Sequence, residues 1–283
     1  MIDLHLHTTA SDGRLTPSEL VSLAHRCGLH TIAVTDHDTV AAIAEATTVA
    51  ATLGMRVVPG IEITAVADAK DVHVLGYFFD PASESLATLL VQQRADRVTR
   101  AREIAARLAA AGIRIDIERL ASDVAARPGT SIGRPQLARE MVRSGAVASV
   151  QDAFDRWLAT GRPAFVPRTG PSPVAVVEAI HAAGGIASLA HPGVTKRDDL
   201  ITPLAQSGLD AIEVYHSDHS ADLQASYRET AARLGLLMSG GSDFHGDDAP
   251  GKASRPQRSV LGVISLPPAD FAALERRSLE RSS

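Results

Sequence analysis

The sequence predicts an α/β fold in which parallel strands alternate with helices and one helical stretch interrupts the alternation. Short, continuous apolar runs such as TIAVT (31–35) indicate strands buried on both faces, which is typical of parallel sheets. Segments with helix-start signals separate these runs, so the order strand, helix, strand recurs along the chain. A mostly helical stretch interrupts this order. We therefore predict a main domain of residues 1–82 and 165–283 and a helical insertion subdomain of residues 83–164.

The composition limits the classes of protein that the chain can belong to. Of its 283 residues 45% are hydrophobic but only 4% are aromatic, so an aliphatic core is expected. The single cysteine, Cys27, excludes an internal disulfide framework and a cysteine-based zinc site. We find no signal peptide and no apolar run of the roughly 18 residues that a membrane span requires, so we expect a cytoplasmic protein. A net charge of −5 argues against broad coating of nucleic acid but not against a small anionic substrate.

The first predicted strand places two histidines on one face. The segment IDLHLH (2–7) alternates apolar and polar residues, and residues two apart in a strand share a face. His5 and His7 therefore point the same way. A polar turn with Asp12 and Gly13 follows and could bring a third ligand to the same point.

The rest of the first half shows further strand and helix signals. Thr16-Pro17-Ser18-Glu19 has an N-cap, a proline at the first helical position and a glutamate at the third, and predicts a helix that ends near Gly28. The other elements expected here are strands at 31–35, 56–64 and 71–79 and a helix at 39–53. We expect the strands to form parallel crossover units.

The insertion and the second half complete the predicted elements. In the insertion we expect helices at 85–111, 117–126, 135–144 and 148–159, and the first of these carries an arginine-rich face that is either solvated or binds nucleic acid. Ser172-Pro173 then starts a helix that ends at 184–185. Strands are expected at 185–190, 209–215 and 236–240. A charged helix should close the chain, with a frayed polar tail at 277–283.

Most of the candidate metal ligands lie at or just past the carboxyl end of a predicted strand. The candidate metal ligands are His5, His7, Asp12, His37, Glu62, His73, His191, Asp243 and His245. Parallel strands closed into a barrel would bring their carboxyl ends, and with them these side chains, to one face. Nine ligands exceed the needs of one tetrahedral ion and suit two or three divalent ions. The absence of thiolate points to Mn²⁺, Zn²⁺ or Fe²⁺ without choosing among them. Three such ions against three carboxylates leave a positive site, for which phosphate is the natural ligand.

The motifs that carry these residues resemble those of the PHP (polymerase and histidinol phosphatase) family. They are DLHLHTTASDG, TDHDT, PGIEIT, DVHVLGY, LAHPG and GSDFH, and they span the chain outside the insertion. The resemblance implies a distorted seven-stranded (β/α) barrel with a trinuclear site. It implies that one ion is held by His5, His7, Glu62 and Asp243, a second by Glu62, His73 and His191, and a third by Asp12, His37 and His245.

The long insertion and its segment SIGRPQLAR (131–139) resemble a bacterial subgroup of that family. Its members remove the 3′-phosphate from nucleoside 3′,5′-bisphosphates, and some trim the 5′ ends of RNA. Arg134 then matches a phosphate-binding arginine, and the residue order Arg134-Pro135 leaves its side chain free to project at a helix start. Arg168 is a weaker candidate for the same task. His216 follows a strand and is a candidate to contact substrate or protonate the leaving group. Asp36 and Asp38 either orient ligands or are solvated.

We accordingly predict a metal-dependent phosphoesterase that converts a nucleoside 3′,5′-bisphosphate to the 5′-monophosphate through a metal-bridged hydroxide. The nearest alternative is a 5′-to-3′ exoribonuclease that uses the same site on single-stranded RNA 5′ ends. A histidinol phosphatase is less favoured because the insertion resembles the nucleotide-acting subgroup. A non-catalytic PHP module is disfavoured because the ligand set is complete.

Overall fold

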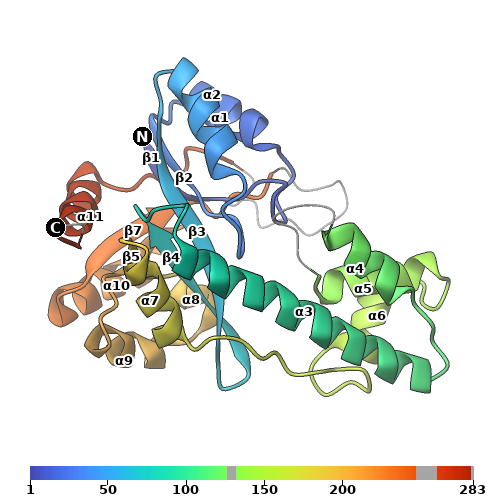
Figure 1. Ribbon diagram of the computed structural model, residues 1–283. Coiled ribbons are helices and arrows are strands. Elements are labelled where there is room, and N and C mark those ends of the chain that lie inside the picture. The colour runs from blue at the N-terminus through green and yellow to red at the C-terminus, as the bar shows by residue number, and fades with distance from the viewer. Residues whose placement is uncertain (126–131, 247–259, 282–283) are drawn as a thin grey trace.

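The computed structural model describes residues 1–125, 132–246 and 260–281, and its strands form one seven-stranded sheet that is nearly closed into a barrel (Figure 1). The strands are β1 (Ile2–Leu6), β2 (Thr31–Val34), β3 (Arg56–Ala67), β4 (Lys70–Tyr77), β5 (Ile186–Leu189), β6 (Ala211–His216) and β7 (Leu237–Gly241), neighbours in space as in sequence. β1 also meets the end of β7, where the His7 N–H donates to Phe244 and the Asp243 N–H donates to His5. The predicted fold class is confirmed.

Strand β4 runs antiparallel to both of its neighbours, so the expectation of parallel crossover units is wrong at this strand. β3 extends beyond its predicted end at 64 and turns into β4 through Asp68 and Ala69, both with positive φ. Parallel strands need a long crossover connection, whereas two residues suffice for a hairpin. The other neighbouring pairs are parallel. Because β4 is reversed, its early residue His73 lies at the end of the barrel where the parallel strands finish.

Helices pack around the strands, and their starts follow the sequence signals. They are α1 (Pro17–Arg26), α2 (Ile43–Thr52), α7 (Pro173–Ala182), α8 (Pro192–Thr195), α9 (Ile201–Gln206), α10 (Ala221–Leu234) and α11 (Pro268–Arg281). The predicted N-caps of α1 and α7 are confirmed: Thr16 accepts from the Glu19 N–H and Ser172 from the Ala175 N–H. No helix in the described part of the chain is both long and apolar enough to cross a membrane.

The frayed tail expected at 277–283 is wrong up to residue 281. Helix α11 continues to Arg281, whose guanidinium donates to Asp210 at 2.8 and 3.1 Å. Asp210 is buried, and it also bonds His181 at 2.7 Å. This distant carboxylate holds the last turn of the helix, and nothing in the local sequence signals it. Residues 282–283 lie outside the described residues.

The insertion contains α3 (Glu84–Ala110), α4 (Ile117–Ala125), α5 (Arg134–Arg143), α6 (Val150–Ala153) and a π-helical turn (Phe154–Leu158). Helix α3 starts against the barrel and runs to the other insertion helices (Figure 1). Its Leu86 and Leu90 pack into the barrel core, whereas Ile104 and Leu108 belong to a separate apolar cluster with α5. This separate cluster supports an insertion subdomain, and the domain boundaries themselves stay a prediction.

Candidate metal centre

The barrel brings all nine predicted ligands to the end where its parallel strands finish. His5 lies within β1 and His7 directly after it, both fully buried. Asp12 lies on the following loop, which folds back so closely that a Cβ at Gly13 would be 2.5 Å from the His7 carbonyl oxygen. Only glycine fits there. Strand β7 also approaches β1 closely, because Gly241 lies directly against the backbone of His5.

Glu62 occupies the centre of the cluster and faces five imidazoles. Its Oε2 lies 3.2 Å from the Nε2 atoms of His5 and His7 and 3.1 Å from the His37 Nδ1. Its Oε1 lies 2.7 Å from the His73 Nδ1 and 3.0 Å from the His191 Nε2. The two oxygens of one carboxylate thus serve two sets of histidines. This is the arrangement expected of a carboxylate that bridges two ions.

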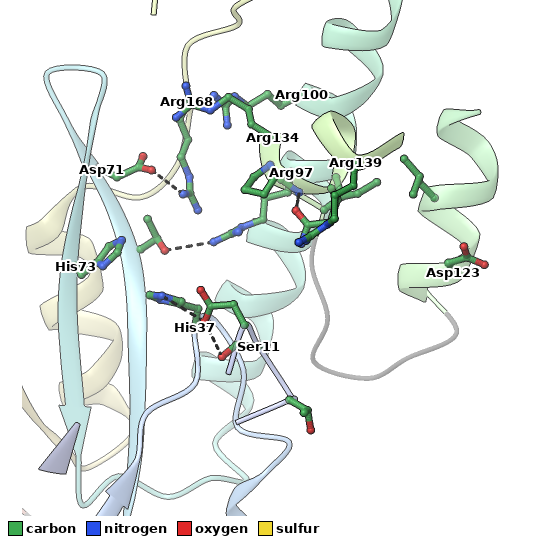
Figure 2. A pocket seen from close by; sticks show the side chains of 18 residues that line it. Ser11, His37, Asp71, His73, Arg97, Arg100, Asp123, Arg134, Arg139 and Arg168 are labelled. Atoms are coloured by element: carbon green, nitrogen blue, oxygen red, sulfur yellow. Dashed lines mark hydrogen bonds and ion pairs between the residues drawn. The ribbon is translucent and has the colours of Figure 1, made fainter. Parts of the chain in front are cut away.

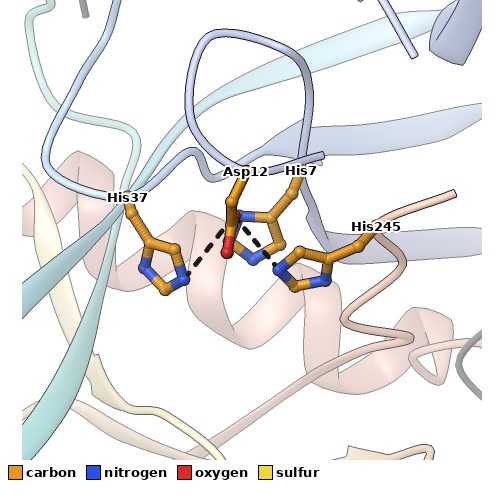
Figure 3. Close-up of side chains that lie close together, drawn as sticks. All are labelled: His7, Asp12, His37 and His245. Atoms are coloured by element: carbon orange, nitrogen blue, oxygen red, sulfur yellow. Dashed lines mark ion pairs between the residues drawn. The ribbon is translucent and has the colours of Figure 1, made fainter. Parts of the chain in front are cut away.

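Asp12 gathers a second group of imidazoles at the more open side of the cluster (Figure 3). Its Oδ1 lies 3.3 Å from the His245 Nε2 and 3.9 Å from both the His37 Nε2 and the His7 Nδ1. His7 and His37 therefore take part in two groups, one through each ring nitrogen. These four side chains could hold one ion, and His5, His7, Glu62 and Asp243 could hold another.

Several ring nitrogens in the cluster are buried beside carboxylates without bonding them. Within the described residues, His7 Nε2, His37 Nδ1 and His73 Nδ1 make no hydrogen bond, although each lies 2.7–3.2 Å from a Glu62 oxygen. Buried polar atoms without partners are costly, and such nitrogens are available as ligands. The donor set of imidazole and carboxylate without thiolate suits first-row divalent metals. The residues present therefore fit a multinuclear metal site.

The electrostatics of the cluster favour bound positive charge. Burial alone would lower the pKa of His7, but the carboxylates of Asp243 and Glu62 raise it to about 10. Burial alone would raise the pKa of Glu62, yet the surrounding histidines hold it well below its usual range. Burial lowers the pKa of His37 to about 4, which keeps a neutral ring with a lone pair. Divalent cations would supply the charge that this arrangement attracts.

Three loop residues adopt left-handed backbone conformations that side chains rarely occupy. Asp38 has a φ of 53°, His191 of 26° and Asp243 of 55°. Such strain is typical of functional sites, where the surrounding structure enforces it. Here each strained residue follows a strand directly or nearly so, and its side chain is buried. The turn geometry therefore directs His191 and Asp243 into the cluster, whereas the Asp38 carboxylate turns to Thr64 and accepts from its N–H at 2.7 Å.

Sequence reasoning missed Glu213, which lies within the apolar strand β6. Its Oε1 lies 2.8 Å from the His5 Nδ1, and its Oε2 accepts from the His191 N–H at 2.7 Å. Burial opposes its ionisation, but the charges of His5 and His216 lower the pKa of Glu213 to about 2. Glu213 therefore orients two predicted ligands, His5 through its ring and His191 through its backbone. A carboxylate inside an otherwise apolar strand was the available signal.

The other polar candidates lie around the cluster rather than in it. His216 is fully buried, with its Nε2 3.4 Å from Asp243 and its Nδ1 accepting from the Asp218 N–H. This placement favours holding Asp243 over contact with a leaving group. Asp36 is buried and accepts from Thr8 at 2.7 Å, so it fixes the loop that follows β1. The solvated interpretation of Asp36 and Asp38 is therefore wrong.

A cavity of about 720 Å³ extends from the open side of the cluster to the insertion. Asp12, His37 and His73 line it at the barrel end. Five arginines line the remainder (Figure 2): Arg97 and Arg100 of α3, Arg134 and Arg139 of α5, and Arg168 of the segment that returns to the barrel. The structure thus places Arg134 and Arg168 in one cavity with predicted metal ligands.

The arginines are held closely together. Arg97 donates to Asp38, and Arg168 donates to Asp71 at 3.1 Å. Burial, together with the charges of Arg134 and Arg168, lowers the pKa of Arg100 to about 10. Like charges crowded into a cavity repel one another, and an anion bound among them would relieve that repulsion. This end of the cavity is therefore suited to a phosphate group.

A nearly closed α/β barrel with six imidazoles and three carboxylates at one end defines a class of metal-dependent hydrolase. Comparison with known proteins agrees, since the PHP domain family matches residues 3–159. The chain is 38% identical to a 3′,5′-nucleoside bisphosphate phosphatase of Chromobacterium violaceum, covering 94% of this chain and 93% of that protein. It is 36% identical to a 5′-3′ exoribonuclease of Haemophilus influenzae, covering 86% of this chain and 89% of that protein.

A solved structure extends the likeness to the fold. A protein from Bifidobacterium adolescentis assigned as a metal-dependent phosphoesterase matches with a TM-score of 0.79 at 32% identity, covering 98% of this chain and 96% of that one. The chain belongs to the PHP family and is a phosphoric ester hydrolase of that family. The family resemblance inferred from the motifs is confirmed.

Proposed function

We propose that the protein removes the 3′-phosphate from nucleoside 3′,5′-bisphosphates and releases the 5′-monophosphate. The observation that carries this proposal is the cavity of about 720 Å³ with metal ligands at one end and five arginines at the other. Such a cavity offers two anion sites of different chemistry, as a substrate with two phosphates requires. The similarity to the C. violaceum bisphosphate phosphatase supports the same substrate class.

The nine clustered residues would hold two or three divalent ions, Mn²⁺ in preference to Zn²⁺ or Fe²⁺. Glu62 would bridge two of them, because its two oxygens face different histidines. When bound, such ions activate water for attack on phosphorus and neutralise the charge that develops on its oxygens. We expect the cytoplasm as the compartment, and a chain with one cysteine, which can form no internal disulfide, is compatible with that expectation.

The insertion would hold the second phosphate. Arg134 projects into the cavity from the first turn of α5, and Arg168 reaches it from the returning segment. A guanidinium can bind two phosphate oxygens at once, which fixes both position and orientation. Arg100 adds positive charge between the two ends, because it donates to the Val166 carbonyl oxygen and not to a carboxylate. The 3′-phosphate is thereby directed to the metal ligands while the 5′-phosphate stays with the arginines.

The general-acid role predicted for His216 has no support from its position. One of its ring nitrogens faces Asp243 and the other accepts from the Asp218 N–H. We propose instead that His216 orients Asp243, as Glu213 orients His5. Groups behind a metal ligand commonly fix its orientation in this way.

A 5′-to-3′ exoribonuclease remains the second candidate. The cavity is also lined by Arg139 and Asp123 of the insertion, where the following nucleotides of an RNA chain would lie. The similarity to the H. influenzae exoribonuclease supports this alternative. A non-catalytic module is disfavoured because no ligand of the set is missing.

One comparison separates the two candidates. Adenosine 3′,5′-bisphosphate and a 5′-phosphorylated oligoribonucleotide are given to the same Mn²⁺-loaded preparation at low and moderate salt. We expect the bisphosphate to have the higher kcat/KM at both. An exonuclease that tracks several phosphates should instead lose affinity steeply with salt. If the oligonucleotide is the better substrate and releases mononucleotides in order from its 5′ end, the exonuclease replaces our proposal.

A further inference from the structure

Arg134 differs from Arg97 and Arg168 in how it is held within the cavity. Arg97 and Arg168 donate to carboxylates, but among the described residues Arg134 has no ion pair with a carboxylate. Its guanidinium carbon instead lies 6.0 Å from the ring centroid of Phe154 and 5.7 Å from that of Phe165. One terminal nitrogen donates weakly to the Leu158 carbonyl oxygen at 3.4 Å.

The type of partner matters for what the guanidinium can still do. A carboxylate occupies N–H donors and cancels charge, whereas an aromatic face attracts the cation and leaves its in-plane donors open. Two rings can therefore restrict the motion of Arg134 without competing with a phosphate. An arginine that binds two oxygens of one phosphate benefits from such restriction, because less side-chain entropy is lost on binding.

Two of the three contacts come from one unusual turn. Phe154 and Leu158 are the first and last residues of the π-helical turn that follows α6, and the Ala159 N–H closes it on the Phe154 carbonyl at 3.1 Å. Single π-helical turns are rare and occur often at functional sites. Here the turn presents a ring and a carbonyl to the same guanidinium. Phe165, on the returning segment, supplies the second ring.

We propose that Phe154 and Phe165 form an aromatic clamp that positions Arg134 for the phosphate remote from the metal ligands. The inference rests on the proposed function and adds two positioning residues to it. The clamp acts through Arg134 and touches neither the metal ligands nor the reacting phosphate. Its loss should therefore weaken binding of substrates that carry the second phosphate and spare those that lack it.

The test measures kcat and KM of Phe154→Leu and Phe165→Leu on a nucleoside 3′,5′-bisphosphate and on the matching nucleoside 3′-monophosphate. Leucine keeps an apolar side chain but removes the ring face. We expect KM for the bisphosphate to rise about three- to tenfold in each variant, in the range of a partly desolvated cation–π contact, with kcat unchanged. Kinetics on the 3′-monophosphate should stay within about twofold. Tyrosine at either position keeps the face and should restore the parent KM.

A matched control lies in the same turn. Trp157 contacts Arg156, at 5.9 Å from its guanidinium carbon, and does not line the cavity. Trp157→Leu should leave the ratio of the two substrates unchanged, although it alters the same π-helical turn. Equal losses on both substrates in the Phe variants would show a general structural effect and overturn the clamp.

Arg134→Ala separates this inference from the proposed function. In that background the Phe→Leu changes should have no further effect on KM, as expected when they act only through Arg134. If Arg134→Ala raises KM for the bisphosphate but neither Phe→Leu change does, the clamp alone is wrong. If Arg134→Ala has no effect on the bisphosphate, the second-phosphate role of Arg134 fails first, and the clamp loses its purpose with it.

Discussion

The barrel and the insertion meet at one cavity but carry opposite charge. Residues 83–164 contain 13 arginines, no lysine and 9 acidic residues, a net charge of +4. The remainder of the chain has 15 basic and 24 acidic residues, a net charge of −9. The clustered carboxylates of the barrel therefore attract cations, whereas the arginines of the insertion, together with Arg168 of the returning segment, can bind phosphate directly. Substitutions in the two regions should therefore have different effects on metal content and on activity.

The largest effect is expected in the barrel. Asp243→Ala or His191→Ala should lower the bound metal and reduce kcat/KM by about three orders of magnitude, roughly 4 kcal/mol of transition-state stabilisation. Both residues lie on loop ends and serve the site more than the core. Elemental analysis, turnover and circular dichroism of the purified variants would check this. Full metal content with full activity would contradict the ligand assignment.

The insertion should give a smaller and substrate-specific effect. Arg134→Ala should weaken binding of the bisphosphate by about 1.5–3 kcal/mol, the range for hydrogen bonds to a charged group, or roughly 10- to 150-fold in kcat/KM. Metal content should not change, because Arg134 is not one of the clustered residues. A loss below about threefold on the bisphosphate would argue against the second anion site.

A substitution at Glu213 tests whether the predicted ligands His5 and His191 need a residue that holds them in place. Glu213→Gln keeps the shape but weakens the hold on the His5 ring and the His191 backbone. We expect a loss of about 10- to 100-fold in metal affinity or activity, as is typical of groups behind a metal ligand. Metal titration followed by activity measured at saturating Mn²⁺ would show whether the loss is recovered. Unchanged affinity and activity would mean that the barrel positions its ligands without Glu213.

The smallest effect is expected on the outer face of α3. Arg102 pairs with Glu118, and both side chains are more than half exposed. Arg102→Ala should change kcat/KM for the bisphosphate by less than about twofold, since exposed ion pairs contribute little. Assays on the oligoribonucleotide across a salt series sharpen the comparison. A reduced salt dependence in this variant would mean that the insertion guides RNA along this face.

The fold and the clustering of the nine candidate ligands could be predicted from the sequence because most of these residues accompany a local pattern. His5 and His7 alternate with apolar residues, and His37 and His191 follow short apolar runs. The direction of β4 was predicted wrongly because the strand signals at 56–64 and 71–79 left a gap at 65–70 that could hold a connection. In the structure β3 continues to Ala67, and a two-residue turn leads directly into β4. A continuous hairpin leaves no space for a crossover helix.

Features that depend on distant partners were not readable in the same way. The end of α11 looks polar and frayed until Asp210, 71 residues before Arg281, is placed beside it. The aromatic rings around Arg134 lie 20 and 31 residues further along the chain, with no motif that links them. The roles assigned to the nine clustered residues, and to Arg134 and Arg168, stay predictions until variants are measured.

Helix α3 also sets a distance. Its 27 residues span about 40 Å at 1.5 Å per residue, with one end packed into the barrel core and the other into the insertion core. One residue added between Leu90 and Arg97 would rotate everything beyond it by about 100°, turning Arg97 and Arg100 out of the cavity. One whole turn added would keep their facing and move them about 5.4 Å outward. On the proposed function, the length of α3 therefore sets the separation between the metal ligands and the arginines, and only changes of about one whole helical turn would keep Arg97 and Arg100 facing the cavity.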